Sequence, residues 1–356
     1  MSNDGAPASK TIREGLGPMR LLVIAIFLIG ALVLVAGGAV IGGYAWLGYQ
    51  FNAEGPGQED TTILLERGAS VRAIAAQLEA RGLISDQRIF LAQLRLDEEL
   101  GRERAPMRAG EFAIPAGASM AEIHDVLAHG EVIQHPVSVP EGLTSAMIVR
   151  IVEASDVLTG EIERVPAEGT LLPDTYLVDR GTSRQAVLDR MAAAQTRLLD
   201  QLWETRDADL PFGTREEAIN LASIVEKETG IAHERPMVAS VFVNRLRRGI
   251  RLQSDPTIIY GITGGEPLGR GIRRSELDDT TNPYHTYHID GLPPTPIANP
   301  GRESIAAVLN PPESNYLFFV ADGTGGHAFA ATLAEHNRNV ARWRQIERER
   351  ARSGGR

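Results

Sequence analysis

An uncharged, strongly apolar segment near the N-terminus constrains this chain more than any other feature. No charged residue occurs from Leu21 to Ala53. A helix that crosses a bilayer needs about 20 consecutive apolar residues, whereas a surface helix of a soluble domain keeps a polar face. The segment therefore predicts a transmembrane helix at 21–46, preceded by a tail at 1–20.

The charges that flank this segment indicate its orientation. Basic residues precede it and acidic residues follow it: Lys10, Arg13 and Arg20, then Glu54, Glu59 and Asp60. Basic flanks are retained on the cytoplasmic side. We therefore expect a single-pass protein of the cytoplasmic (inner) membrane, with a cytoplasmic N-terminus and the rest of the chain in the periplasm. The alternative is a cleaved signal peptide, whose apolar region usually has only about 7–15 residues.

Composition excludes several classes of function. The chain has no cysteine, which rules out disulfides, thiolate nucleophiles and cysteine-ligated zinc. Its net charge of −10 does not favour nucleic acid as a partner. The length of 356 residues predicts two or three folded units.

A polar linker at 47–60 precedes an internal repeat within 61–136. Residues 63–84 and 112–133 match at a constant offset, and each copy has a strand-like start, a Gly-Ala-Ser turn and an amphipathic helix. Ser70 and Ser119 are expected to cap these helices, because a serine hydroxyl accepts from free amides of the first turn. Such units resemble LysM modules, which bind glycans rich in N-acetylglucosamine. The alternative is a spacer that holds the remaining chain off the membrane.

Residues 137–345 predict a mixed domain followed by a basic tail at 346–356. Helices are expected at 183–205, 215–229 and 234–248, and another begins at Asn299-Pro300. Segments 316–320 and 327–332 predict a hairpin, and the long region 249–300 is rich in glycine and proline. With few strands and no regular βαβ series, the fold class is α+β: a transmembrane helix, a small LysM-like α/β module and a mixed α+β domain.

The helix expected at 215–229 carries two candidate acids. Thr214 and Glu217 form a capping box at its start. Its apolar stripe is Ala218, Leu221, Ala222, Val225 and Thr229, which places Glu226 on one flank and Glu228 on the other. A half-buried carboxyl has a raised pKa, as a general acid requires. The alternative is a solvated helix end, and spacing does not choose between the two glutamates.

Several sequence blocks resemble the endolytic murein transglycosylase (YceG-like) family. In order they are EGTLLPDTY, LASIVEKETG, ERPMVASVFVNRLRRGIRLQSDPTIIYG, NPYHTYHIDGLPPTPIANPG and YLFFVADGTGGHAF. The resemblance covers about residues 60–345. It implies that Glu226 is the catalytic acid/base and that Glu228 supports it.

Polar residues of these blocks are the candidates for substrate binding, because such residues sit on loops held by a scaffold. For each of them the alternative is turn chemistry or a satisfied backbone bond. His285 and His288 lack a third ligand, so no metal site is expected. The substrate-binding candidates are Gln253, Asp255, Thr257, Tyr260, Asn282, Tyr284, Thr286, Tyr287, Asn299 and His327.

The resemblance implies cleavage of the bond between N-acetylmuramic acid and N-acetylglucosamine within peptidoglycan glycan strands. The products would carry 1,6-anhydro-muramyl ends, and no cofactor would be needed. The expected role is to terminate growing strands, with cell-wall synthases of the membrane as partners. Two alternatives stay open: a hydrolase that uses Asp255 or Glu228 as a second carboxylate, and a non-catalytic glycan-binding scaffold.

Overall fold

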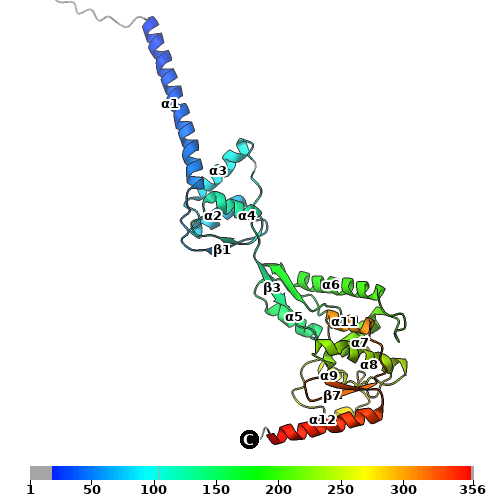
Figure 1. Ribbon diagram of the computed structural model, residues 1–356. Helices are drawn as coiled ribbons and strands as arrows, with labels where there is room; N and C mark the ends of the chain where they lie inside the picture. Colours follow the sequence, from blue (N-terminus) through cyan, green and yellow to red (C-terminus); the bar gives the residue numbers. More distant parts are fainter. Residues whose placement is uncertain (1–17, 103, 354–356) are drawn as a thin grey trace, which may run out of the picture. The chain divides into compact units, whose positions relative to one another are not determined.

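The computed structural model describes residues 18–102 and 104–353, which form two compact units (Figure 1). Unit 1 ends at Ile133 and unit 2 begins at Gln134. This border lies close to the expected one between 136 and 137. Of the tails expected at 1–20 and 346–356, residues 1–17 and 354–356 lie outside the described residues, whereas 18–20 and 346–353 are helical.

Helix α1 (Pro18–Asn52) is the apolar helix that the sequence predicts. From Met19 to Asn52 it is long and apolar enough to cross a membrane. The helix is longer than the expected span, since residues 47–52 are helical rather than part of a linker. One side of its last turn is buried: Phe51 is 0% exposed, whereas Tyr49 on the other side is 73% exposed.

The remainder of unit 1 is a small α/β module built on the repeat. Strands β1 (Thr61–Leu65) and β2 (Gly110–Ile114) pair antiparallel, with Ile63 opposite Phe112. Helices α2 (Val71–Ala80), α3 (Gln87–Glu99) and α4 (Met120–His129) complete it. Ser70 and Ser119 cap α2 and α4, as the sequence predicts. The likeness to LysM modules stays a prediction.

The expected linker packs onto this module instead of standing free. The amide of Gly55 donates to the carbonyl of Gly117 at 3.0 Å, and the amide of Gly117 donates to Gly57 at 2.7 Å. A side chain at position 55 would collide with the carbonyl oxygen of Ala118, which lies 2.2 Å from an added Cβ. Together with buried Phe51, these contacts join α1 to the module.

The first part of unit 2 is a sheet-and-helix layer. Strand β3 (Gln134–Ser138) pairs antiparallel with β5 (Thr175–Asp179), and β4 (Leu158–Thr159) pairs parallel with β6 (Thr182–Ser183). Helices α5 (Ser145–Ala154) and α6 (Arg184–Glu204) cover it. Its core contains Val137, Ile148, Leu171, Val178 and Met191.

The second part of unit 2 surrounds one central helix, α7 (Arg215–Glu228), which packs against α8 (Arg235–Arg247), α9 (Asp255–Thr263) and α11 (Arg302–Leu309) (Figure 1). The stripe that the sequence assigns to the core of α7 is buried. A 3-10 turn η1 (Ala232–Glu234) precedes α8, and α10 (Arg274–Leu277) lies in the loop after α9. Strands β7 (Phe318–Ala321) and β8 (His327–Ala330) form the expected antiparallel hairpin, against which α12 (Leu333–Ser353) packs.

Two sequence-based expectations about this part are wrong. The helix expected at Asn299-Pro300 starts later, with Gly301 at its N-cap, because the Asn299 side chain is engaged elsewhere. Asp255 and Thr257, which were expected on a loop, lie instead in the first turn of α9, where the missing amide of Pro256 costs nothing.

We predict that Phe51→Ala loosens the module. Removing a fully buried phenylalanine side chain costs about 3–5 kcal/mol, because a cavity replaces its contacts. Phe51 packs against Phe90 of α3, with ring centroids 5.8 Å apart. Hydrogen–deuterium exchange in detergent should therefore become faster in α3. Tyr49→Ala, on the exposed side of the same helix, is the control, and equal exchange in both variants would contradict the docking of α1.

Candidate functional site

The two glutamates of the EKE sequence lie at the C-terminal end of α7. The helix starts with the predicted capping box, in which Thr214 accepts from the amide of Glu217 and the Glu217 carboxylate accepts from Thr214. Side chains two residues apart are separated by about 200° around a helix. Glu226 and Glu228 therefore point to opposite sides of α7 and have different neighbours.

Glu226 belongs to a buried hydrogen-bond cluster. Its side chain is 4% exposed. One carboxylate oxygen accepts from Nη2 of Arg235 at 3.1 Å. The other accepts from the amide of Gly301 at 2.9 Å and from the hydroxyl of Ser304 at 2.7 Å. Both oxygens are thus occupied by donors of the protein itself.

The same arginine links this cluster to the loop before α5. Nη2 of Arg235 also donates to Glu141 at 3.0 Å. Burial raises the pKa of the Glu141 carboxyl, and the charge of Glu226 acts in the same direction, while Arg235 opposes both. An added Cβ at Gly301 would lie 1.8 Å from an oxygen of Glu141, so a side chain there would displace the Glu141 carboxylate. The cluster therefore fastens α7, α8 and α11 to the first part of unit 2.

Glu228 lies in a different environment. One of its oxygens accepts a hydrogen bond from the hydroxyl of Ser254 of the segment before α9. Burial raises the pKa of its carboxyl to about 7. The charge of Asp255 raises this pKa further, whereas the Ser254 hydrogen bond and the charges of His327 and Arg245 lower it. Near neutral pH this carboxyl can hold a proton and release it.

Four of the predicted substrate-binding residues surround Glu228. Gln253 and Asp255 are exposed on either side of Ser254, and the hydroxyl of Tyr287 donates to Asp255 at 2.8 Å. Gln253 adopts the left-handed backbone conformation, with φ of 53°. This conformation costs a non-glycine residue about 1–3 kcal/mol and is found mainly at functional sites.

His327 is the fourth of these residues, and it is held by an acid that the sequence analysis missed. Its amide donates to one oxygen of Glu234 at 2.8 Å, and its Nδ1 lies 2.7 Å from the other. This two-point contact fixes the orientation of the imidazole ring. No pattern in the sequence marks Glu234, because an acid before a helix is also expected from the helix dipole alone.

Four other predicted binding residues are buried parts of the scaffold. Thr257 and Thr286 are 0% exposed, and their hydroxyls lie 2.9 Å apart. Asn299 donates to the carbonyl of Leu143 at 3.1 Å and accepts from the amide of Leu171 at 3.0 Å. Asn282 accepts from the amide of Tyr284 at 2.9 Å. These side chains hold the loops, and their proposed contact with substrate stays a prediction.

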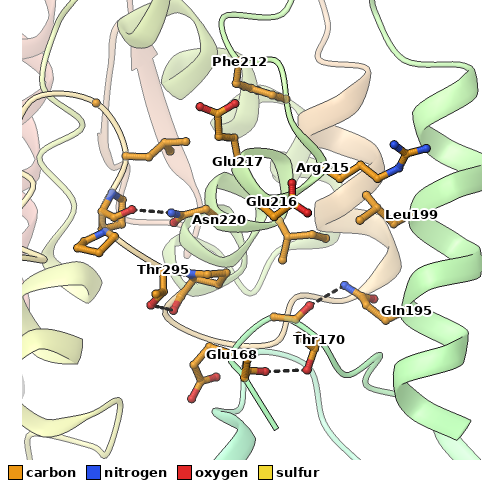
Figure 2. Close-up of a pocket in the computed structure, with 18 of the residues that line it drawn as sticks. Glu168, Thr170, Gln195, Leu199, Phe212, Arg215, Glu216, Glu217, Asn220 and Thr295 are labelled. Atoms are coloured by element: carbon orange, nitrogen blue, oxygen red, sulfur yellow. Dashed lines mark hydrogen bonds between the residues drawn. The ribbon is translucent and has the colours of Figure 1, made fainter. Parts of the chain in front are cut away.

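The last two candidates, Tyr260 and Tyr284, line a pocket of about 1170 Å³ (Figure 2). Their rings make a T-shaped contact with centroids 4.8 Å apart. Burial raises the pKa of Tyr260 to about 12, so its phenol stays neutral. Neither Glu226 nor Glu228 lines this pocket, which lies instead at the N-terminal half of α7.

Comparison with known proteins gives matches over most of the chain. The model of the YceG-like family matches residues 63–342. Two relatives are endolytic murein transglycosylases, from Streptococcus pneumoniae (strain D39) and Bacillus subtilis (strain 168), each 28% identical to this chain. The matches cover 88% and 86% of this chain, and 64% and 90% of the respective relatives. The chain thus spans less than two thirds of the length of the pneumococcal relative.

A solved structure of a yceG-like protein from Listeria monocytogenes is also similar. It is 26% identical, with a TM-score of 0.48, over 79% of this chain and 98% of the other. The family match alone covers well over half of the chain and includes Glu226 and Glu228. It confirms the resemblance seen in the sequence blocks. The chain is therefore a member of the YceG-like family.

Proposed function

We propose that this protein is a membrane-anchored lytic transglycosylase that cleaves peptidoglycan glycan strands internally, with Glu228 as its acid/base. The observation that carries the proposal is the position of the Glu228 carboxyl, which accepts from Ser254 between the exposed residues Gln253 and Asp255, and whose pKa burial raises to about 7. The family and the activity named for two relatives support the substrate class.

The reaction needs one carboxyl group that acts twice. Protonated Glu228 would first donate to the glycosidic oxygen between N-acetylmuramic acid and N-acetylglucosamine. The carboxylate would then accept the proton of the muramyl 6-hydroxyl as that oxygen closes onto C1. The product carries a 1,6-anhydro end, and the regained proton restores the acid. The nucleophile is part of the substrate, so ring closure benefits from intramolecular proximity.

This assignment moves the catalytic role from Glu226, where the sequence resemblance placed it, to Glu228. An acid/base must offer an oxygen to the substrate. Both oxygens of Glu226 are engaged by Arg235, Gly301 and Ser304. Glu228 instead has Ser254 on one oxygen and lies where Gln253, Asp255 and His327 can contact a sugar. In this proposal Glu226 fastens the domain together.

Hydrolysis of the same bond is the second candidate, and one observation favours it. The charge of Asp255 is close enough to Glu228 to raise its pKa, so a second carboxylate is present. Most glycosidases use a pair of carboxylates with a water molecule. Tyr287 donates to Asp255 at 2.8 Å, which positions this side chain.

The anchoring of the enzyme follows from α1, which can span a membrane. We place its N-terminus in the cytoplasm, and the module that follows α1 and unit 2 in the periplasm, because basic residues precede the helix and acidic residues follow it. The module of unit 1 would assist by binding glycan, and cell-wall synthases in the same membrane would supply the strands that are cut.

We predict that Glu228→Gln lowers the rate of strand cleavage by at least about 10²–10⁴-fold, because glutamine cannot transfer the proton. Its thermal unfolding should remain cooperative. Glu226→Gln is the matched variant two residues away. It should keep cleavage per folded molecule but lower the melting temperature, because buried Arg235 loses a charged partner. Mass spectrometry of muropeptides from defined strands measures both rates.

The outcomes of this pair of variants are distinct. A folded Glu226→Gln protein without activity, beside an active Glu228→Gln protein, would return the catalytic role to Glu226. Products of the unmutated enzyme formed in oxygen-18 water should carry 1,6-anhydro ends without label. Labelled reducing ends would establish the hydrolase instead, and retained activity in both variants would remove the catalytic proposal.

The pH dependence of kcat/KM should reflect the protonation state of the Glu228 carboxyl. Cleavage begins from the protonated form, whose pKa is about 7. The rate should therefore be level below that pH and fall above it, approaching about tenfold per pH unit. Ser254→Ala removes a hydrogen bond that lowers this pKa, so its alkaline limb should move to higher pH. A limb that is absent or moves to lower pH would contradict the assignment.

Reporter fusions at Gly68 and Asn220 test the membrane orientation. Both should be active with an exported-side reporter and inactive with a cytoplasmic one, since the basic flank keeps the N-terminus inside. A cytoplasmic reporter that is active at either position would contradict the proposed compartment and with it the access to peptidoglycan.

A further inference from the structure

The pocket at the N-terminal half of α7 is separate from the site of the proposed catalytic acid, Glu228. It is enclosed by α6, the first turns of α7, the turn at 167–170 and the loop at 291–296 (Figure 2). Its volume of about 1170 Å³ is ample for a ligand larger than a single sugar. Neither the residues of the Glu226 ion-pair cluster nor those around Glu228 line it.

One part of the pocket wall is apolar and preformed. Leu199, Phe212, Ile219, Leu246 and Leu292 line it, with four proline rings from the adjacent loops. Gln195 and Asn220 hold the backbone around it, donating to the carbonyls of Gly169 at 3.1 Å and Pro293 at 2.6 Å (Figure 2). Such a wall suits the methylene groups of a side chain.

The charged groups at the pocket are predominantly acidic. Arg215 is the only basic side chain among the lining residues, and Asp200 pairs with it at 3.1 Å. Glu217 accepts the hydrogen bonds of the α7 capping box. Glu168 already accepts from the amide of Ser145 and from the side chain of Asn299, and burial raises the pKa of its carboxyl. The exposed Glu216 remains as negative charge that no basic side chain lining the pocket balances. The wall therefore favours a ligand with an ammonium group.

The distance to Glu228 matches a short peptide. Asn220 and Glu228 are eight residues apart on α7, a rise of about 12 Å. An extended peptide spans about 3.3–3.6 Å per residue, so three or four residues cover this distance. In peptidoglycan the peptide stem is attached to the muramyl sugar whose bond would be cut, and its diamino acid carries an amine.

Resting on the proposed function, we propose that this pocket binds the peptide stem of the substrate, with the amine-bearing side chain of the stem against Glu216 and its methylene groups against the apolar wall. The enzyme would thereby prefer strands that still carry stems. Glu228 performs the chemistry, and the pocket selects which muramyl residue is presented to it.

Binding of a free peptide to the full-length protein in detergent tests the pocket without any cleavage. The probes are alanyl-γ-glutamyl-lysine and its norleucine analogue, which keeps the methylene chain but lacks the ammonium group. Calorimetry should give about tenfold weaker binding for the norleucine analogue, because the charge contact is lost. Equal affinity for the two probes, or no binding of the lysine peptide, would overturn the proposal.

Two matched variants on α6 locate the binding. Thr196 is exposed and lines the pocket, so Thr196→Arg places a long cationic side chain in it. Ala193→Arg adds the same side chain to the same helix at an exposed position that does not line the pocket. Peptide binding should be lost in the first variant and kept in the second. Equal behaviour of the two would place the peptide elsewhere.

Cleavage assays then separate this proposal from the proposed function. The KM ratio between bare strands and stem-bearing strands should fall about tenfold in Thr196→Arg and stay unchanged in Ala193→Arg. An unchanged ratio in Thr196→Arg would overturn the pocket assignment even where cleavage itself is confirmed. Peptide binding that persists in a protein without cleavage activity would instead leave the pocket in place and reject the proposed function.

Discussion

The buried ion pair between Arg235 and Glu226 is the contact on which the arrangement of unit 2 depends. It joins the end of α7 to the start of α8, and the same two side chains reach Glu141, Gly301 and Ser304. Removing one partner of a buried pair leaves an uncompensated charge, which is far more costly than the net contribution of the pair. The helices that carry the candidate site are therefore held in one register by electrostatics as well as by packing.

This ion pair explains how Glu226 and Glu228, two residues apart on one helix, acquire different chemistry. A 200° turn separates Glu226 from Glu228, so one carboxylate enters the ion-pair cluster and the other faces the loops of α9 and the β7–β8 hairpin. Donors of the protein satisfy the carboxylate of Glu226, and burial raises the pKa of the Glu228 carboxyl to about 7. The rigid Arg235–Glu226 pair on one side of α7 thus holds in place the Glu228 carboxyl on the other side, which can exchange its proton near neutral pH.

Local signals in the sequence predicted most elements, and the site was only partly predictable. Capping residues such as Ser119 and Thr214, and the stripe of α7, are short-range features that the structure keeps. Periodicity could not rank Glu226 against Glu228, because their difference comes from Arg235 and Ser254, which join them only in the fold. For the same reason the sequence predicted Asn299 as a helix cap, although in the fold its side chain is hydrogen-bonded to the backbone of Leu143 and Leu171.

The docking of Phe51 has a mechanical consequence for a membrane-spanning α1. The helix has 35 residues and is about 52 Å long, whereas the hydrocarbon core is about 30 Å thick. A helix longer than the bilayer adjusts by tilting, and the tilt depends on local lipid thickness. Because the last turn of α1 is fixed in the module core, any tilt is transmitted as a rotation of the module. Lipid composition would thereby influence the orientation of the module relative to the membrane.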